Sequence, residues 1–312
     1  MSLALVFPGQ GAQTVGMGRD LAEAYPAAKA VFDEVDEALG EKLSDLVWEG
    51  DAETLTLTQN AQPALMATSM AAIRALEAEG FDVGAAAYVA GHSLGEYSAL
   101  CAVGALELAD TARLLRLRGE AMQRAVPVGE GAMAALLGLD SAAAEDVAEA
   151  AAEGQVCQVA NENDPMQNVI SGNRAAVERA VALAKEAGAK RAVMLPVSAP
   201  FHCALMTPAA AEMAEALDTV EIRDPKVPVV ANVLASEVTD GTVIRSLLVD
   251  QVSSKVRWRA SVEWMANQGV TEFWEVGAGK ALSGMIRRIA KEAELRQVGT
   301  ADGVAEAAAS RG

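Results

Sequence analysis

The sequence is poor in the residues that disulfide frameworks, metal centres and membrane spans require. It has three cysteines, an odd number without the spacing of metal ligands, and only two histidines. We therefore expect no disulfides and no metal site, as in a reducing cytoplasm. No apolar run reaches the roughly 18 to 20 residues that cross a bilayer, which predicts no association with membranes. Residues 1–7 lack the basic start and cleavage pattern of a signal peptide, so we expect a cytoplasmic protein.

Basic residues are also scarce relative to acidic ones. The chain has 25 lysines and arginines against 43 aspartates and glutamates, a formal net charge of −18. This charge opposes attraction to phosphate backbones, which excludes nucleic acid as a partner. One segment, residues 279–291, carries four cations and no acid. It is either a local site for an acidic ligand or, equally well for any single cation, the solvated face of an amphipathic helix.

What the chain does contain is an α/β pattern. Hydrophobic residues make up 52 % of the 312 residues, and short apolar runs alternate with helical patterns. The predicted strands of the larger unit are residues 3–7, 85–90, 227–232 and 271–276. Its predicted helices are residues 17–39, a helix starting near Pro63, and residues 110–122, 206–217 and 242–252. We expect a parallel-sheet core, and we expect the alanine-rich tail from Gly303 to fray.

A second pattern interrupts the first between residues 132 and 197. It predicts strands at residues 132–139, 155–160, 167–171 and 191–197, with helices at 141–153, where Ser141 is a candidate cap, and 174–187. Residues 161–165 are predicted to form a turn. The order βαββαβ is that of a ferredoxin-like unit. We therefore predict a large domain of residues 1–128 and 198–312, and an inserted small domain of residues 129–197.

A serine between two glycines follows the strand predicted at 85–90. The segment Gly91-His92-Ser93-Leu94-Gly95 then leads into a helical pattern, and strand, sharp turn and helix with a serine at the apex form a nucleophile elbow. The glycines allow the strained backbone that exposes the hydroxyl group. The alternative is an ordinary Gly-Ser-Gly turn without chemistry.

A glycine-rich loop, Pro8-Gly9-Gln10-Gly11, follows the first predicted strand. A dinucleotide fingerprint would need a third glycine where Thr14 stands. The free amides of this loop are better suited to supply one donor of an oxyanion hole, with Leu94 after the serine as the second. An ordinary tight turn is the alternative.

A serine nucleophile needs a base, and histidine is the usual one near neutral pH. His92 is adjacent to Ser93 and projects away from it in a strand-like backbone, so His202 is the better candidate. An acid could orient His202, and chain order suggests Asp164, although a backbone carbonyl would serve equally well. The alternative for His202 is a hydrogen-bonded surface histidine.

Arg118 lies on a face of the helix at 110–122 that turns inward. A buried guanidinium usually needs a carboxylate partner. Either an acid of the protein or an acid of the substrate could fill this role.

Several motifs occur together in one order along almost the whole chain. They are Phe7-Pro8-Gly9-Gln10-Gly11, Gln59-Asn60-Ala61-Gln62-Pro63-Ala64, Gly91-His92-Ser93-Leu94-Gly95-Glu96-Tyr97, Leu117-Arg118-Gly119, Phe201-His202 and Glu275-Val276-Gly277-Ala278-Gly279-Lys280. In this combination the chain resembles the malonyl-CoA:acyl carrier protein transacylases. The resemblance implies a hydrolase-like large domain interrupted by a ferredoxin-like small one.

The resemblance also assigns roles to residues. It implies that Ser93 is acylated, that His202 is its base, and that the oxyanion amides belong to Gln10 and Leu94. Arg118 is then the partner of the malonyl carboxylate. Two further roles follow: the carbonyl of Gln251 holds the histidine, so that no catalytic acid is needed, and Phe201 favours malonyl over bulkier methylmalonyl units. The chain departs from the family at Ser253–Trp258 and at Ala278.

The predicted function is transfer of a malonyl group from malonyl-CoA to the phosphopantetheine thiol of acyl carrier protein, for fatty acid synthesis. CoA thioester is a substrate, and no cofactor is expected. The alternatives are a serine thioesterase or esterase, a trans-acting acyltransferase of polyketide synthesis, and a noncatalytic carrier-binding protein. We expect a monomer, with the acidic carrier docking on a basic patch made of Lys190, Arg191, Lys280, Arg287, Arg288 and Lys291.

Overall fold

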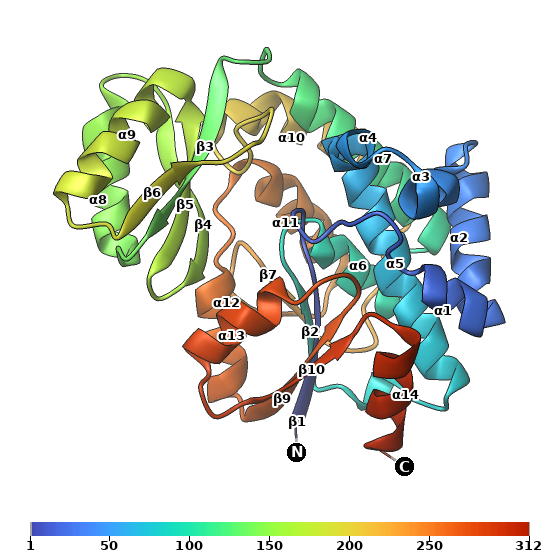
Figure 1. Ribbon diagram of the computed structural model, residues 1–312. Helices are drawn as coiled ribbons and strands as arrows, with labels where there is room; N and C mark the ends of the chain where they lie inside the picture. The colour runs from blue at the N-terminus through green and yellow to red at the C-terminus, as the bar shows by residue number, and fades with distance from the viewer. Residues whose placement is uncertain (1, 312) are drawn as a thin grey trace.

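The computed structural model describes residues 2–311 (Figure 1). Within this range a six-stranded sheet has the order β10-β9-β1-β2-β7-β8. Its strands are β1 (Ser2–Phe7), β2 (Tyr88–Gly91), β7 (Val229–Ala231), β8 (Ser236–Val238), β9 (Val270–Val276) and β10 (Glu294–Val298). All neighbours pair in parallel except β7 and β8, which are antiparallel. The predicted parallel-sheet core is therefore confirmed.

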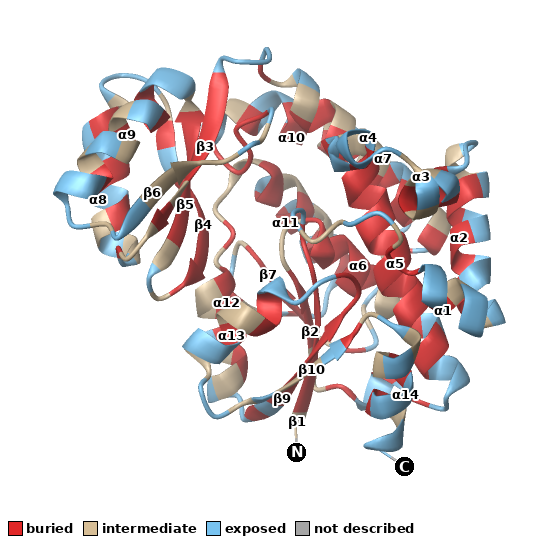
Figure 2. Cartoon of the chain, in the orientation of Figure 1, coloured by how far each residue is buried: buried red, intermediate tan, exposed pale blue. Residues whose placement is uncertain are grey.

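Two helical layers cover the large sheet because its strands are apolar on both faces, as parallel strands are. Along β1, Leu3, Leu5 and Phe7 pack into one core cluster, whereas Ala4 and Val6 pack into another. Figure 2 shows the central strands and α5 as mostly buried. The helices of the first layer are α1 (Arg19–Ala24), α2 (Pro26–Leu39), α3 (Leu43–Glu49), α4 (Ala52–Thr56), α5 (Thr58–Ala78), α6 (Gly95–Ala102), α7 (Leu108–Arg124), α10 (Thr207–Leu217), α11 (Gly241–Ser253) and α14 (Ala301–Ala309). The second layer consists of α12 (Trp258–Asn267) and α13 (Ala281–Ile289).

The inserted segment forms a separate four-stranded sheet with the order β4-β5-β3-β6. Its elements follow the predicted order: β3 (Gly131–Leu137), α8 (Ser141–Ala152), β4 (Cys157–Asp164), β5 (Gln167–Asn173), α9 (Arg174–Glu186) and β6 (Arg191–Met194). One face of this sheet packs on α8 and α9 in a core of its own. Met133 and Val169 belong instead to the core of the large sheet, so the other face of the small sheet is turned toward the large one.

The turn predicted at residues 161–165 is wrong for residues 161–164, which continue strand β4. Asn161, Glu162 and Asp164 are buried despite their polarity. Two hydrogen bonds to Val256 extend the pairing here, from Val256 N to Ala160 O at 2.8 Å and from Glu162 N to Val256 O at 2.9 Å. A distant segment thus supplies the partners that a local reading of the sequence could not.

Other differences also have local causes. The chain from Gly303 does not fray, because α14 buries Val304 and Ala307 against the core. Asp140, not Ser141, caps α8 by accepting a hydrogen bond from Ala143 N at 2.9 Å. The helix predicted to start near Pro63 begins at Thr58, and the predicted helix at residues 17–39 is broken between α1 and α2 at Tyr25.

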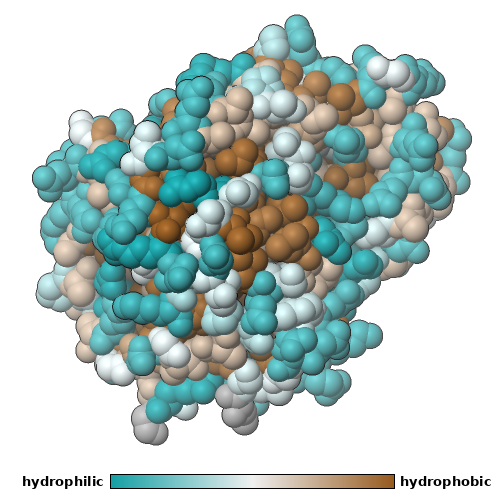
Figure 3. All heavy atoms as spheres, turned by 180° about the vertical axis from the view of Figure 1, so that it is seen from behind, coloured by the Kyte–Doolittle hydropathy of each residue, from teal (hydrophilic) through white to brown (hydrophobic). Residues whose placement is uncertain are grey.

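The face of the molecule opposite to that in Figure 1 carries both hydrophobic and hydrophilic side chains. Hydrophobic side chains reach this face in a central area, and hydrophilic side chains surround them (Figure 3). Across residues 2–311, no helix is long and apolar enough to span a membrane. The same residues contain no group of three or more histidine, cysteine or acidic side chains arranged to hold a metal ion.

Candidate active site

Ser93 lies at a sharp bend between β2 and α6, where its backbone has φ of +54°. Few non-glycine residues adopt this left-handed conformation, and those that do concentrate at functional sites. The flanking glycines make the bend sterically feasible. A Cβ atom on Gly91 would lie 1.9 Å from the backbone of Gly95, and one on Gly95 would lie 2.3 Å from the carbonyl oxygen of Phe7. The predicted elbow is therefore confirmed in its geometry.

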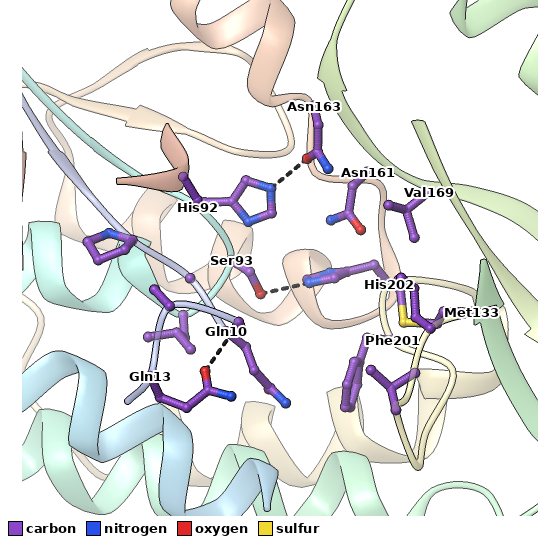
Figure 4. Close-up of a pocket in the computed structure, with 18 of the residues that line it drawn as sticks. Gln10, Gln13, His92, Ser93, Met133, Asn161, Asn163, Val169, Phe201 and His202 are labelled. Atoms are coloured by element: carbon purple, nitrogen blue, oxygen red, sulfur yellow. Dashed lines mark hydrogen bonds between the residues drawn. The ribbon is translucent and has the colours of Figure 1, made fainter. Parts of the chain in front are cut away.

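His202 reaches Ser93 from a loop 109 residues further along the chain. Its Nε2 atom lies 2.7 Å from Ser93 Oγ (Figure 4), and its Nδ1 atom lies 2.9 Å from the carbonyl oxygen of Gln251. A carbonyl oxygen only accepts, so Nδ1 carries the hydrogen and the lone pair of Nε2 faces the serine hydroxyl. His202 also has a positive φ, +57°, which is a second strained residue at the same point of the molecule.

The imidazole of His202 is held in its neutral form. Burial, together with the positive charge of Arg118, lowers the pKa of His202 from 6.5 to about 3. A neutral imidazole with its lone pair on the serine hydroxyl is ready to accept a proton. The acid that chain order suggested, Asp164, is engaged elsewhere, since its carboxylate accepts from Arg288 Nε at 2.6 Å.

Arg118 is 1 % exposed and lies on α7 beside the serine. It donates to Gln62 Oε1 at 2.7 Å, to Gln251 Oε1 at 2.8 Å and to Ser93 Oγ at 3.2 Å. Within residues 2–311 no carboxylate forms an ion pair with it, and its Nε is without a hydrogen-bond partner. Burial of this charge lowers the pKa of Arg118. The guanidinium therefore remains available to a carboxylate from outside the protein.

Close helix packing brings Arg118 to this position. A Cβ atom on Gly119 would lie 2.5 Å from Cα of Gln59, so only glycine lets α7 approach α5 this closely. The approach places Gln62 against the guanidinium. Thr58, at the start of α5, donates to Gln10 Oε1 at 2.8 Å and so fixes the glycine-rich loop to the same helix.

A cavity of about 430 Å³ lies between the two sheets and contains these groups. Met133 and Val169 of the small sheet line it opposite Ser93, as Figure 4 shows. The following predicted site residues line it: Gln10, Ser93, Leu94, Arg118, Phe201 and His202. Gln251, fully buried behind them, completes the predicted set. The fold thus brings together every residue that we predicted for the site.

Comparison with known proteins agrees with this geometry. The sequence model of the acyl transferase domain family matches residues 4–306. The chain is 51 % identical to the malonyl CoA-acyl carrier protein transacylase of Escherichia coli K12 over 92 % of both chains. It is 49 % identical to the protein of the same name from Bacillus subtilis, over 92 % of this chain and 90 % of that protein. The chain belongs to the malonyl CoA-acyl carrier protein transacylase family.

Solved structures of the family share the whole fold. The acyl-carrier-protein S-malonyltransferase of Bartonella henselae superposes with a TM-score of 0.97 at 56 % identity, covering 98 % of each chain. A second structure is a type II polyketide synthase acyl-carrier protein in complex with its malonyl-transacylase. It superposes with a TM-score of 0.96 at 42 % identity, covering 99 % of this chain and all of that one. The resemblance, the fold class and the enzyme class that we predicted, an acyltransferase, are therefore confirmed.

The departure of the chain from the family at Ser253–Trp258 leaves the site geometry intact. The carbonyl of Gln251 still holds His202, and Val256 pairs with strand β4. The Trp258 ring lies 5.7 Å from that of His92, whose Nε2 is 2.9 Å from Asn163 Oδ1. His92 therefore links the elbow to strand β4 and to α12, and it also lines the cavity.

Three buried polar residues of the site had no predicted role. Gln62 and Glu96 occur within the motifs that carried the resemblance, so the sequence held a signal without an assignment. Asn232 had no such signal. Its Oδ1 accepts from Ser93 N at 2.8 Å, and its Nδ2 donates to Gly91 O at 2.6 Å, which holds the elbow from the turn after strand β7.

Proposed function

We propose that the chain transfers a malonyl group from malonyl-CoA to the phosphopantetheine thiol of acyl carrier protein through a malonyl-Ser93 intermediate, for fatty acid synthesis. One observation carries the proposal: a serine hydroxyl in a single cavity lies 2.7 Å from a neutral imidazole and 3.2 Å from a buried guanidinium. The first two groups form a nucleophile with its base, and the third matches an acyl group that ends in a carboxylate.

In the first half-reaction, Ser93 Oγ attacks the thioester carbonyl of malonyl-CoA while His202 Nε2 takes the hydroxyl proton. The negative charge then forms on the carbonyl oxygen, where the backbone amides of Gln10 and Leu94 donate to it. Collapse of the tetrahedral intermediate breaks the carbon–sulfur bond. The departing CoA sulfur receives the proton from the imidazolium, and malonyl-Ser93 remains.

The second half-reaction reverses these steps with a different thiol. His202, neutral again, takes the proton of the phosphopantetheine thiol as its sulfur attacks the ester carbonyl of malonyl-Ser93. The serine oxygen leaves with that proton. During both steps the carbonyl of Gln251 accepts from His202 Nδ1 and stabilises the imidazolium without a catalytic carboxylate.

Arg118 selects the acyl group in this proposal. Its guanidinium makes a charge-assisted, bidentate contact to the malonyl carboxylate, which acetyl groups lack. Phe201, 9 % exposed at the cavity wall, leaves little room for a branch next to the carboxylate and so favours malonyl over methylmalonyl units.

The carrier docks on the basic patch in this account. All of its cations are exposed: Lys190, Arg191, Lys280, Arg287, Arg288 and Lys291. The net charge of the rest of the chain repels an acidic carrier, so local positive charge is needed to guide it. The solved complex of a related transacylase with its carrier supports this kind of partner. Because Arg288 already pairs with Asp164, Arg287 and Lys291 are the more available cations on α13.

The organisation of the chain follows from the same proposal. Residues 129–197 act as an inserted small domain and residues 1–128 and 198–312 as the catalytic domain, with the cavity between the two sheets. In this proposal the enzyme works as a monomer in the cytoplasm.

The experiment that tests the function is release of CoA from malonyl-CoA with and without holo carrier protein. A transferase gives one equivalent of CoA per enzyme without carrier and continuous release with it. Continuous release without carrier would make the enzyme a thioesterase and contradict the proposal.

A further inference from the structure

The buried carboxylate of Glu96 is a feature that the mechanism above does not use. Glu96 lies on α6, three residues after the nucleophile, and is 2 % exposed. Its Oε2 accepts from the backbone N–H of Asn232 at 3.0 Å and from Gln251 Nε2 at 2.8 Å. Burial raises the pKa of Glu96 to about 7, against the opposing effects of these hydrogen bonds and of Arg118. A carboxyl group buried this deeply, with no part in the reaction, calls for an explanation.

Glu96 is one of two acceptors that fix which way the side-chain amide of Gln251 points. The amide has one donating end and one accepting end. Its Nε2 donates to Glu96 Oε2 and also to the carbonyl oxygen of Ser93 at 3.0 Å. Both partners are acceptors, so the nitrogen must face them and Oε1 must face Arg118, from which it accepts at 2.8 Å. The reversed amide would put an NH₂ group against the guanidinium, donor against donor.

The same arrangement keeps two opposite charges apart. A carboxylate in direct contact with Arg118 would occupy the N–H groups that a substrate carboxylate needs. Here the amide of Gln251 stands between Glu96 and Arg118, so the positive charge is partly balanced through space while its donors meet only neutral oxygens. Without the negative charge of Glu96, the buried positive charge of Arg118 would be less well compensated.

We propose that Glu96 is a positioning residue that sets the preference of the enzyme for acyl groups ending in a carboxylate. It acts through Gln251, whose amide it helps to orient, so that Arg118 is held beside Ser93 while no carboxylate of residues 2–311 occupies its donors. This inference rests on the proposed function, because it assumes that Arg118 binds the malonyl carboxylate.

The test compares Glu96→Gln with wild type in single-turnover acylation of Ser93 by malonyl-CoA and by acetyl-CoA. The variant keeps the size of the side chain but removes its charge and one acceptor. We expect the malonyl-to-acetyl ratio of kcat/KM to fall at least tenfold, mainly because kcat/KM for malonyl-CoA falls. A loss of purely structural origin would lower both rates alike. Asp36→Asn is the matched control, because Asp36 is also a buried carboxylate that accepts a backbone N–H, from Ser44 at 2.9 Å, but on α2 and outside the site.

A second variant decides the question if Glu96→Gln does not fold. Gln251→Glu retains the backbone carbonyl that holds His202 but brings a carboxylate to the guanidinium. We expect it to lower malonyl transfer more than acetyl transfer, so that the malonyl-to-acetyl ratio falls. An unchanged malonyl-to-acetyl ratio in the folded Glu96→Gln variant, or in Gln251→Glu in its place, would overturn the inference.

Arg118→Ala, measured in parallel, separates this inference from the proposed function. If Arg118→Ala lowers the rates of malonyl and acetyl transfer equally, Arg118 does not bind the substrate carboxylate, and the inference fails as well. If Arg118→Ala lowers the malonyl-to-acetyl ratio and Glu96→Gln does not, only the role proposed for Glu96 is wrong.

Discussion

The Nδ1–H group of His202 donates to the backbone carbonyl of Gln251 at 2.9 Å, where a hydrolase triad would have a carboxylate. A carbonyl group carries only a partial charge, so it fixes the tautomer of the imidazole without drawing a proton onto it. Burial and the neighbouring guanidinium keep the pKa of His202 far below that of a free histidine, although the hydrogen bond to the carbonyl opposes them. The imidazole proposed as the base is therefore neutral at neutral pH, and no acidic side chain of residues 2–311 lines the cavity.

His202 should not titrate between pH 8 and pH 5. Burial lowers the pKa of both His92 and His202 from 6.5, so the folded chain keeps them neutral while the unfolded chain binds protons. They therefore contribute stability that is present above about pH 6.5 and is lost as the pH falls toward the folded pKa. The ring signals of the two histidines can be followed by NMR. A midpoint near 6.5 for His202 would contradict the proposed state of the base.

Arg118→Ala should reduce malonyl transfer much more than acetyl transfer. A hydrogen bond to a charged group is worth about 1.5–3 kcal/mol, which corresponds to roughly a 10- to 100-fold loss in kcat/KM for malonyl-CoA. For malonyl-CoA, the kcat/KM of Arg118→Lys should lie between those of wild type and Arg118→Ala, since an ammonium group keeps the charge but not the planar pair of donors. Thermal denaturation checks that each variant is folded, and equal losses for both acyl groups would remove Arg118 from this role.

Gly9→Ala should impair catalysis by displacing the loop that carries the Gln10 amide. The added Cβ atom would lie 2.7 Å from the backbone oxygen of His92, so the loop has to move. Loss of one oxyanion donor costs about 10²–10³ in kcat. Gly284→Ala is the control, because its Cβ atom would meet nothing within 4 Å. If Gly9→Ala retains full kcat, the donor comes from another group.

Charge reversal at Arg287 and Lys291 should weaken the productive docking of the carrier. We expect the KM for holo carrier protein to rise several-fold at low ionic strength, and the effect to shrink as salt screens the charges. Lys29→Glu, an exposed reversal on α2, is the control. If the KM is the same in the patch variant and the control at low salt, the carrier docks on another surface.

Local signals explain why the elbow and the base could be predicted from the sequence. The two glycines around Ser93 meet a steric requirement of the bend itself, so the motif specifies its own geometry. With only two histidines in the chain and His92 directed away, the choice of His202 required no knowledge of the fold.

Contacts between distant residues explain what could not be predicted. Glu96 and Gln251 are 155 residues apart, and Gln62 and Arg118 are 56 apart, so nothing local shows that these polar side chains are buried together. The same reason explains the error at residues 161–164. Their asparagines and acids favour a turn locally, but in the fold Asn163 reaches His92 and Asp164 pairs with Arg288.

The most direct test of the account is the mass of the intact enzyme after brief exposure to malonyl-CoA without carrier. We expect a gain of one malonyl group, located on Ser93 by peptide mapping, absent in Ser93→Ala and removed when holo carrier protein is added. An unmodified enzyme that still transfers malonyl, or a malonyl group on any other residue, would contradict it.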